Sequence, residues 1–227
     1  MKRRIRIQGF FIFLAATTTI LLSKLLFPHW KKEILDEFLD AIGIGLVLFG
    51  FLFRIAARGY KAENSPEGKN LITNGAYGLM RNPMYFGTLL VGLGINLVLF
   101  EWWAAILFCI IFSLIYIRQI HREEADLSQR FGEEYKTYCN VTPRYFPNLF
   151  NINLRDHLFF KWLWIQKELP SLIGVIGVII TIEIWEDMRL FGYNECRKEL
   201  AELFLIITCF IIVFSLFYEK ENISRKY

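Results

Sequence analysis

The chain has 227 residues, of which 55% are hydrophobic and 17% aromatic. This apolar content is typical of membrane proteins and argues against an ordinary soluble domain. The net charge of +4 comes without a basic-aromatic stripe, so nucleic-acid binding is not indicated. The four cysteines lack paired spacing and the three histidines lie far apart, so neither a disulfide framework nor a metal site is predicted.

Six apolar blocks follow one another along the chain, each near the roughly 20 residues that a helix needs to cross a bilayer. The blocks are residues 7–27, 37–57, 84–100, 102–117, 169–185 and 201–218. Because such blocks form helices in lipid, the sequence predicts an all-α, multi-pass transmembrane helical bundle of about six spans. Glu101, Trp102 and Trp103 separate the third block from the fourth, which predicts a tight hairpin with indoles at the interface.

The first block follows a basic start, a pattern that also fits a signal peptide. It continues to Leu26, which is long enough to span and favours an uncleaved anchor. In the second block we expect Gly43, Gly45 and Gly50 to permit close contact between helices. A nucleotide-binding loop is disfavoured there, because these glycines lie inside an apolar helix.

Charge asymmetry predicts the orientation of the chain. If the N-terminus is cytoplasmic and the chain crosses six times, 20 of the 26 Lys and Arg fall on the cytoplasmic side. Both termini are then cytoplasmic, and the membrane is the plasma (inner) membrane if the organism is prokaryotic. We divide the chain into an N-terminal hairpin (1–57), a catalytic and cofactor module with hairpin 84–117 (58–150), and a C-terminal interfacial segment with a third hairpin (151–227).

The residues before the third block suggest a binding site for an anion. Pro83 is suited to begin a helix, which places Arg81 and Asn82 at its N-terminus. Unpaired N–H groups and the helix dipole attract anions there, so a ligand carboxylate could bind beside Arg81. The alternative is that Arg81 only anchors the helix to lipid phosphate.

A double glutamate follows the middle hairpin. Glu123 and Glu124 are consecutive, so on a helix they point about 100° apart and only one is expected to face the hairpin. The alternative is a solvated acidic face paired with nearby arginines. The apolar spacing over 118–138 predicts a helix that lies on the membrane surface or folds back over the hairpin, loosened at Gly132. Cys139 is interpreted as a small apolar contact, since no base is placed beside it.

Taken together, these motifs resemble the isoprenylcysteine carboxyl methyltransferase family, with phospholipid N-methyltransferases as more distant relatives. The resemblance covers about 80 residues, from Lys69 to Pro147. The residues that carry it are Gly75, Tyr77, Arg81, Asn82, Pro83, Tyr85, Gly87, Glu123, Glu124, Phe131 to Tyr135, Tyr138, and Thr142 to Arg144. It implies a multi-pass helical enzyme that uses S-adenosylmethionine without a Rossmann domain, with the cofactor pocket on the cytoplasmic face.

The resemblance also implies which residues form the site. The cofactor is expected to contact Lys69, Asn70, Leu71, Ile72, Thr73, Tyr77, Asn82, Tyr85 and Glu123. The catalytic candidates are Arg81, Glu124, Arg118 and Arg122. Two positions depart from the family: Asn82 stands where histidine is frequent, and Gln119 stands where the family has a substrate-side arginine, a role that Arg118 or Arg122 could take.

The predicted function is methyl transfer from S-adenosylmethionine to a lipid-like or prenylated acceptor in the membrane. A carboxylate acceptor is ionised at neutral pH and needs no base, whereas an amine acceptor needs a base role for Glu123 or Glu124. The alternatives are a phospholipid N-methyltransferase, an NADPH-dependent enzyme similar to sterol reductases, and a non-catalytic membrane protein of the same fold.

Overall fold

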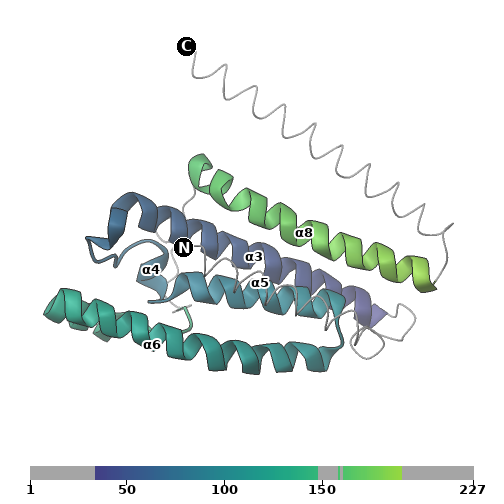
Figure 1. Cartoon of the computed structure of the whole chain (residues 1–227), viewed down its shortest axis with the longest axis horizontal. Helices are drawn as coiled ribbons and strands as arrows, with labels where there is room; N and C mark the ends of the chain where they lie inside the picture. The colour runs from purple at the N-terminus through teal and green to yellow at the C-terminus, as the bar shows by residue number, and fades with distance from the viewer. Residues whose placement is uncertain (1–33, 148–157, 159–160, 191–227) are drawn as a thin grey trace, which may run out of the picture. The chain divides into compact units, whose positions relative to one another are not determined.

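The structure is a computed structural model that describes residues 34–147, 158 and 161–190. Every regular element in these residues is helical (Figure 1). The elements are α3 (Ile34–Asn64), the 3-10 helix η1 (Pro66–Gly68), α4 (Ala76–Leu79), α5 (Pro83–Leu99), α6 (Trp102–Val141) and α8 (Trp162–Leu190). The all-α prediction therefore holds for the described residues, and the first and sixth predicted spans lie outside them.

The close contact between α3 and α5 depends on glycine. A Cβ atom built on Gly50 would lie 2.6 Å from the carbonyl oxygen of Gly87, and one on Gly94 would lie 2.4 Å from that of Gly43. These two crossings run in opposite order along the chain, so the helices are antiparallel. Small residues let membrane helices approach this closely. The packing interpretation is confirmed for Gly43 and Gly50 and is wrong for Gly45, which has no side chain or neighbouring backbone within 4 Å of its built Cβ.

The predicted hairpin between α5 and α6 is present. α5 ends at Leu99, and after two intervening residues Trp102 begins α6, which extends for 40 residues to Val141. Gly132 interrupts its regular geometry with φ of 51° and ψ of −120°. Since a positive φ is easily adopted by glycine alone, this residue lets the end of α6 fold back.

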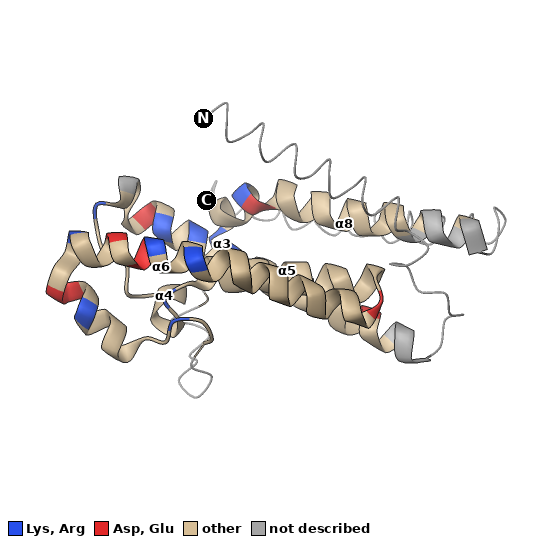
Figure 2. Ribbon diagram, turned by 60° about the horizontal axis from the view of Figure 1, so that its bottom comes forward, with Lys and Arg blue, Asp and Glu red and all other residues tan. Residues whose placement is uncertain are grey.

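Three described helices are long and apolar enough to cross a membrane: α3 from Phe38, α6, and α8 as far as Ile182. α5 is apolar but has only 17 residues, about 26 Å of helix. Charged residues gather at the end of α3 and from Arg118 onward in α6, near α4, whereas α5 and residues 102–117 of α6 carry none (Figure 2). Many large apolar side chains of α6 are exposed, as expected for helices that face lipid.

A buried carboxylate holds the beginning of α8 to α3. Glu168 is 1% exposed. Its Oε2 lies 3.2 Å from Arg54 Nη2, and its Oε1 pairs with Arg58. Arg54 also donates to the hydroxyl of Thr88 in α5, at 2.8 Å. Two guanidinium groups compensate the desolvation of this carboxylate, which would otherwise be costly. The sequence analysis did not anticipate this cluster.

A small hydrophobic core lies between α3, α4 and α5. It consists of Phe53, Ala56, Ala57, Ala76, Leu79, Met80 and Leu158, with Tyr77, Met84 and Phe86 packed against it. By its contacts the chain divides into the units Met1–Val175 and Ile176–Tyr227. All candidate site residues belong to the first unit, where this core fixes α4 and the beginning of α5 relative to α3.

Candidate active site

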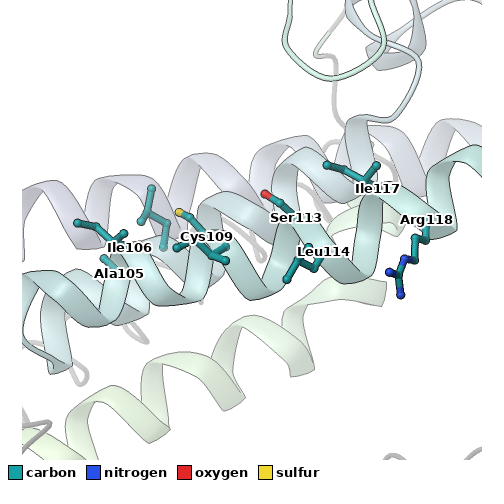
Figure 3. A pocket seen from close by; sticks show the side chains of 9 residues that line it. Ala105, Ile106, Cys109, Ser113, Leu114, Ile117 and Arg118 are labelled. Atoms are coloured by element: carbon teal, nitrogen blue, oxygen red, sulfur yellow. The ribbon is translucent and has the colours of Figure 1, made fainter.

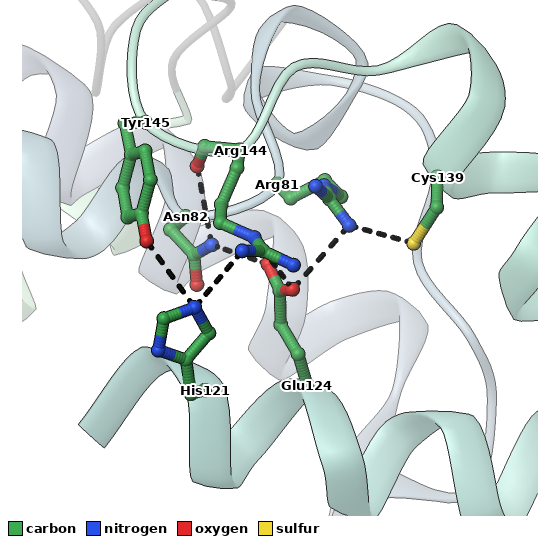
Figure 4. Close-up of polar contacts among 7 residues, drawn as sticks. All are labelled: Arg81, Asn82, His121, Glu124, Cys139, Arg144 and Tyr145. Atoms are coloured by element: carbon green, nitrogen blue, oxygen red, sulfur yellow. Dashed lines mark hydrogen bonds and ion pairs between the residues drawn. The ribbon is translucent and has the colours of Figure 1, made fainter. Parts of the chain in front are cut away.

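Glu124 is the centre of a buried polar cluster at the beginning of α5 (Figure 4). It is 7% exposed. One carboxylate oxygen, Oε2, lies 3.3 Å from Arg81 Nη1 and 2.9 Å from Arg144 Nε. The other, Oε1, accepts a hydrogen bond from Asn82 Nδ2 at 3.0 Å. A carboxylate this buried requires such partners, so Glu124 ties α6 to the residues that precede α5.

The segment after α6 is held against the same residues. The backbone N–H of Arg81 donates to the carbonyl oxygen of Pro143 at 2.8 Å, and Asn82 Nδ2 donates to that of Arg144 at 3.2 Å. Pro143 stops α6 from continuing, and the chain then turns back toward Arg81. The sequence analysis included Pro143 and Arg144 in the family motif but did not predict Arg144 as a site residue.

The cluster carries a net positive charge. Arg81 and Arg144 contribute two positive charges and Glu124 one negative charge. His121 Nε2 lies beside them, 2.9 Å from Arg144 Nη1. Arg81 Nε is buried and has no hydrogen-bond partner among the described residues. The cluster thus has the charge and a spare donor for one more anion.

Glu123 makes a separate, exposed contact with α5. Its Oε1 accepts hydrogen bonds from Tyr85 Oη at 2.5 Å and from Gln119 Nε2 at 2.8 Å. Glu123 therefore contacts α5 itself, whereas the partners of Glu124 lie outside the hairpin, in line with the expectation that only one glutamate faces the hairpin.

Tyr77 lies beside this group, on α4. Burial, and after it the negative charge of Glu123, raises the pKa of the Tyr77 hydroxyl above its ordinary value. The Tyr77 carbonyl oxygen accepts a hydrogen bond from Tyr138 Oη at 2.7 Å, a contact between α4 and the end of α6. The sequence analysis left two placements open, along the membrane surface or folded back over the hairpin, and this contact places the end of α6 against α4, which precedes the hairpin.

An aromatic cavity of about 180 Å³ opens next to Asn82 and Tyr85. Its aromatic lining residues are Tyr85, Phe86, Phe112, Tyr116, Tyr145 and Phe146. Phe112 and Tyr116 are stacked, with ring centroids 4.1 Å apart. Aromatic faces attract cations through their quadrupoles, so the lining suits a positively charged group.

A larger apolar groove of about 610 Å³ follows the outer side of α6 (Figure 3). It extends from Ala105 to Arg118, a rise of about 20 Å along the helix. Ser113 and Ile117 line both the groove and the aromatic cavity, so the two are adjacent. Arg118 lies at one end of the groove and is not part of the Glu124 cluster.

Arg122 and residues 70–73 share no hydrogen bond or ion pair with these groups among the described residues. Arg122 is exposed and forms no ion pair with any described residue. Asn70 exchanges hydrogen bonds with Ser65 and donates to the carbonyl oxygen of Asn64. No hydrogen bond between residues 70–73 and either glutamate is found in the described part of the chain, so their role as cofactor contacts stays a prediction.

The chain is similar to known membrane methyltransferases. Residues 39–134 match the model of the phospholipid methyltransferase family. The chain is 30% identical over 127 residues to a probable protein-S-isoprenylcysteine O-methyltransferase of Oryza sativa, covering 52% of this chain and 65% of that protein. It is 30% identical over 123 residues to protein-S-isoprenylcysteine O-methyltransferase A of Arabidopsis thaliana, covering 51% of this chain and 61% of that protein.

A further relative carries a different name. A cobalt-zinc-cadmium resistance protein of Cupriavidus metallidurans is 27% identical over 188 residues, covering 72% of this chain and 84% of that protein. Within the described residues no three His, Cys, Asp or Glu side chains gather as a metal site. No solved structure matches the chain.

The apolar helices and the polar cluster at their end are those of a helical membrane protein with a buried polar site. The matches above show that the chain is similar to the phospholipid methyltransferase family and to protein-S-isoprenylcysteine O-methyltransferases. It covers less than two thirds of the length of the two plant methyltransferases.

Proposed function

We propose that this protein transfers a methyl group from S-adenosylmethionine to a lipid-like acceptor that enters from the bilayer. One observation carries the proposal: a positively charged cluster, an aromatic cavity and an apolar groove adjoin one another at the beginning of α5. Asn82 belongs to both the cluster and the cavity, and Ser113 lies between the cavity and the groove.

The Glu124 cluster fits the carboxylate end of the cofactor. Its net positive charge and the spare donor of Arg81 suit an anion. The beginning of α5 adds free backbone N–H groups. The family often has histidine where this chain has Asn82. Because Asn82 is neutral and donates to Glu124, the charge that binds the carboxylate is assigned to Arg81.

The aromatic cavity fits the sulfonium. Its volume of about 180 Å³ is below the roughly 300–1,000 Å³ of complete ligand pockets, so it would hold only that part of the cofactor. When bound, S-adenosylmethionine supplies a methyl group that its sulfonium already makes electrophilic. The protein then has to align the acceptor with the methyl group and exclude water, for which the ring faces of Tyr85 and Tyr116 are suited.

The two glutamates have different roles in this proposal. Glu124 is held by Arg81, Arg144 and Asn82, so it is poorly placed to accept a proton and is assigned to positioning. Glu123 is exposed and accepts a hydrogen bond from Tyr85, and its proposed role is to bind a hydroxyl or ammonium group of the cofactor. Since Glu124 is committed to its partners in the cluster, an acceptor that is already ionised, such as a carboxylate, is assigned here because it needs no base.

The apolar groove on α6 suits the hydrocarbon part of the acceptor. Its length of about 20 Å and its aliphatic lining match a lipid chain, and it adjoins the cavity through Ser113 and Ile117. Arg118, at one end, could contact a negatively charged group of the acceptor, which is the role predicted for it. Oligomeric partners are not implied by any of these features.

Binding of labelled S-adenosylmethionine to the detergent-purified protein tests the proposal. We expect saturable binding that Arg81→Ala weakens about ten- to a hundredfold, because one charge-assisted contact contributes about 1.5–3 kcal/mol. Arg130→Ala is the matched control, since Arg130 is exposed and, among the described residues, pairs with Asp126 alone, in the same helix. Equal affinity in wild type and Arg81→Ala would remove Arg81 from the site.

A second experiment identifies the reaction class. Membranes that contain the protein are incubated with labelled cofactor and either a prenylcysteine analogue or phosphatidylethanolamine. Label in the first supports a carboxylate acceptor, and label in the second supports N-methylation. Thermal stabilisation by NADPH and not by S-adenosylmethionine would favour the reductase alternative, and stabilisation by neither would favour a non-catalytic protein.

A further inference from the structure

The hydroxyl of Tyr135 is buried and unpaired. Tyr135 is 4% exposed, and its Oη has no hydrogen-bond partner among the described residues. The nearby thiol of Cys139 affects the Tyr135 pKa, but a thiol is only a weak hydrogen-bond partner. Buried polar groups without a partner are rare in folded proteins, because desolvation is then uncompensated.

General looseness of the helix end does not explain this hydroxyl. Tyr138, one turn further on, donates to the Tyr77 carbonyl oxygen at 2.7 Å. The rings of Tyr135 and Tyr138 are in contact, with centroids 6.0 Å apart. One of two neighbouring tyrosines is thus satisfied within the protein, and the other presents a free donor.

The surroundings of the Tyr135 hydroxyl favour an anion. Cys139 Sγ lies 2.7 Å from Arg81 Nη1, and the positive charge of Arg81 also acts on Tyr135. Arg81 has an unpaired donor of its own, the buried Nε. Burial, followed by the charge of Glu124 and the Cys139 thiol, raises the pKa of Tyr135 above its ordinary value, so the hydroxyl keeps its proton at neutral pH.

We infer that Tyr135 binds the carboxylate of S-adenosylmethionine together with Arg81. This inference rests on the proposed function and adds a binding residue to it. Two buried donors without partners and one net positive charge are what a carboxylate needs. A carboxylate of the methyl acceptor is less suitable than that of the cofactor. The acceptor is assigned to the apolar groove, which ends at Arg118, whereas Tyr135 lies further along α6, beyond Gly132.

Two probes separate the carboxylate from the rest of the cofactor. S-adenosylhomocysteine has the carboxylate, and its decarboxylated analogue keeps the adenosine, the thioether and the amine. We expect Tyr135→Phe in the full-length protein to weaken S-adenosylhomocysteine binding about ten- to a hundredfold and to leave binding of the analogue unchanged. Isothermal titration calorimetry in detergent measures both.

The melting temperature of the unliganded protein distinguishes a binding role from a structural one. If the Tyr135 hydroxyl had a structural role, removing it would lower the melting temperature. Because Tyr135→Phe removes an unpaired buried hydroxyl, the unliganded variant should melt at the same or a higher temperature than wild type. The matched control is Tyr138→Phe, which removes a paired hydroxyl. It should melt at a lower temperature and keep the wild-type ratio of affinities for the two probes.

Several results would overturn the inference. Equal losses for both probes in Tyr135→Phe, or no loss for either, would remove Tyr135 from the carboxylate site. Unchanged S-adenosylhomocysteine affinity with a raised KM for a carboxylate acceptor would assign the hydroxyl to the acceptor. If wild type binds neither probe, the proposed function itself fails.

Discussion

Replacing Glu124 with glutamine tests whether this residue organises the site. The substitution keeps the size of the side chain and one acceptor oxygen, but it removes the charge that faces Arg81 at 3.3 Å and Arg144 at 2.9 Å. Arg81 is only 12% exposed as a side chain, so its charge would be left poorly compensated. Removing one partner of a buried ion pair costs about 3–5 kcal/mol.

This cost predicts a measurable loss of stability. In a chain of this length 1 kcal/mol shifts the melting temperature by roughly 2–4 °C, so a loss of about 3 kcal/mol corresponds to roughly 6–12 °C. The assay is thermal unfolding of the purified protein without ligand. Glu123→Gln is the matched control, because it changes the neighbouring, exposed residue. There the expected loss of unfolding free energy is about 0–1 kcal/mol.

The comparison of the two variants decides between the roles of the two glutamates. Glu124→Gln should be the less stable protein, because its partners are buried. If both variants melt within about 2 °C of wild type, the carboxylate of Glu124 is not the support inferred from its contacts. If Glu123→Gln alone melts early, the roles of the two residues are reversed.

Three further predictions follow from other contacts. Glu123→Ala should weaken S-adenosylmethionine binding about ten- to a hundredfold, whereas Cys139→Ala should change the affinity by less than about threefold. Equilibrium binding measures both, and a larger loss of affinity in Cys139→Ala than in Glu123→Ala would contradict the proposed site. Gly50→Val should lower the melting temperature and the yield of folded protein, because its Cβ would lie 2.6 Å from a backbone oxygen of α5. Glu168→Ala should destabilise the protein by several kcal/mol. The control Glu63→Ala, which removes the exposed partner of Lys161, should cost about 0–1 kcal/mol. Thermal unfolding measures both, and equal melting temperatures would argue against a buried ion pair at Glu168.

The sequence by itself determined the helices of the described residues. Apolar blocks of near-bilayer length predicted α3, α5, α6 and α8, because in lipid every backbone polar group must be satisfied within a helix. Pro83 predicted where α5 begins, through its fixed φ and missing N–H. These properties depend on neighbouring residues only, so they can be read without the fold.

Only the tertiary structure decided which side chains meet. Glu123 and Glu124 are equivalent in the sequence, yet one is exposed beside Tyr85 and the other is buried beside Arg81. Arg144 lies 20 residues beyond Glu124, and its approach depends on the fold-back of α6 at Gly132 and the turn after it. The orientation of a helix face is fixed by packing against distant segments, and local sequence does not encode it.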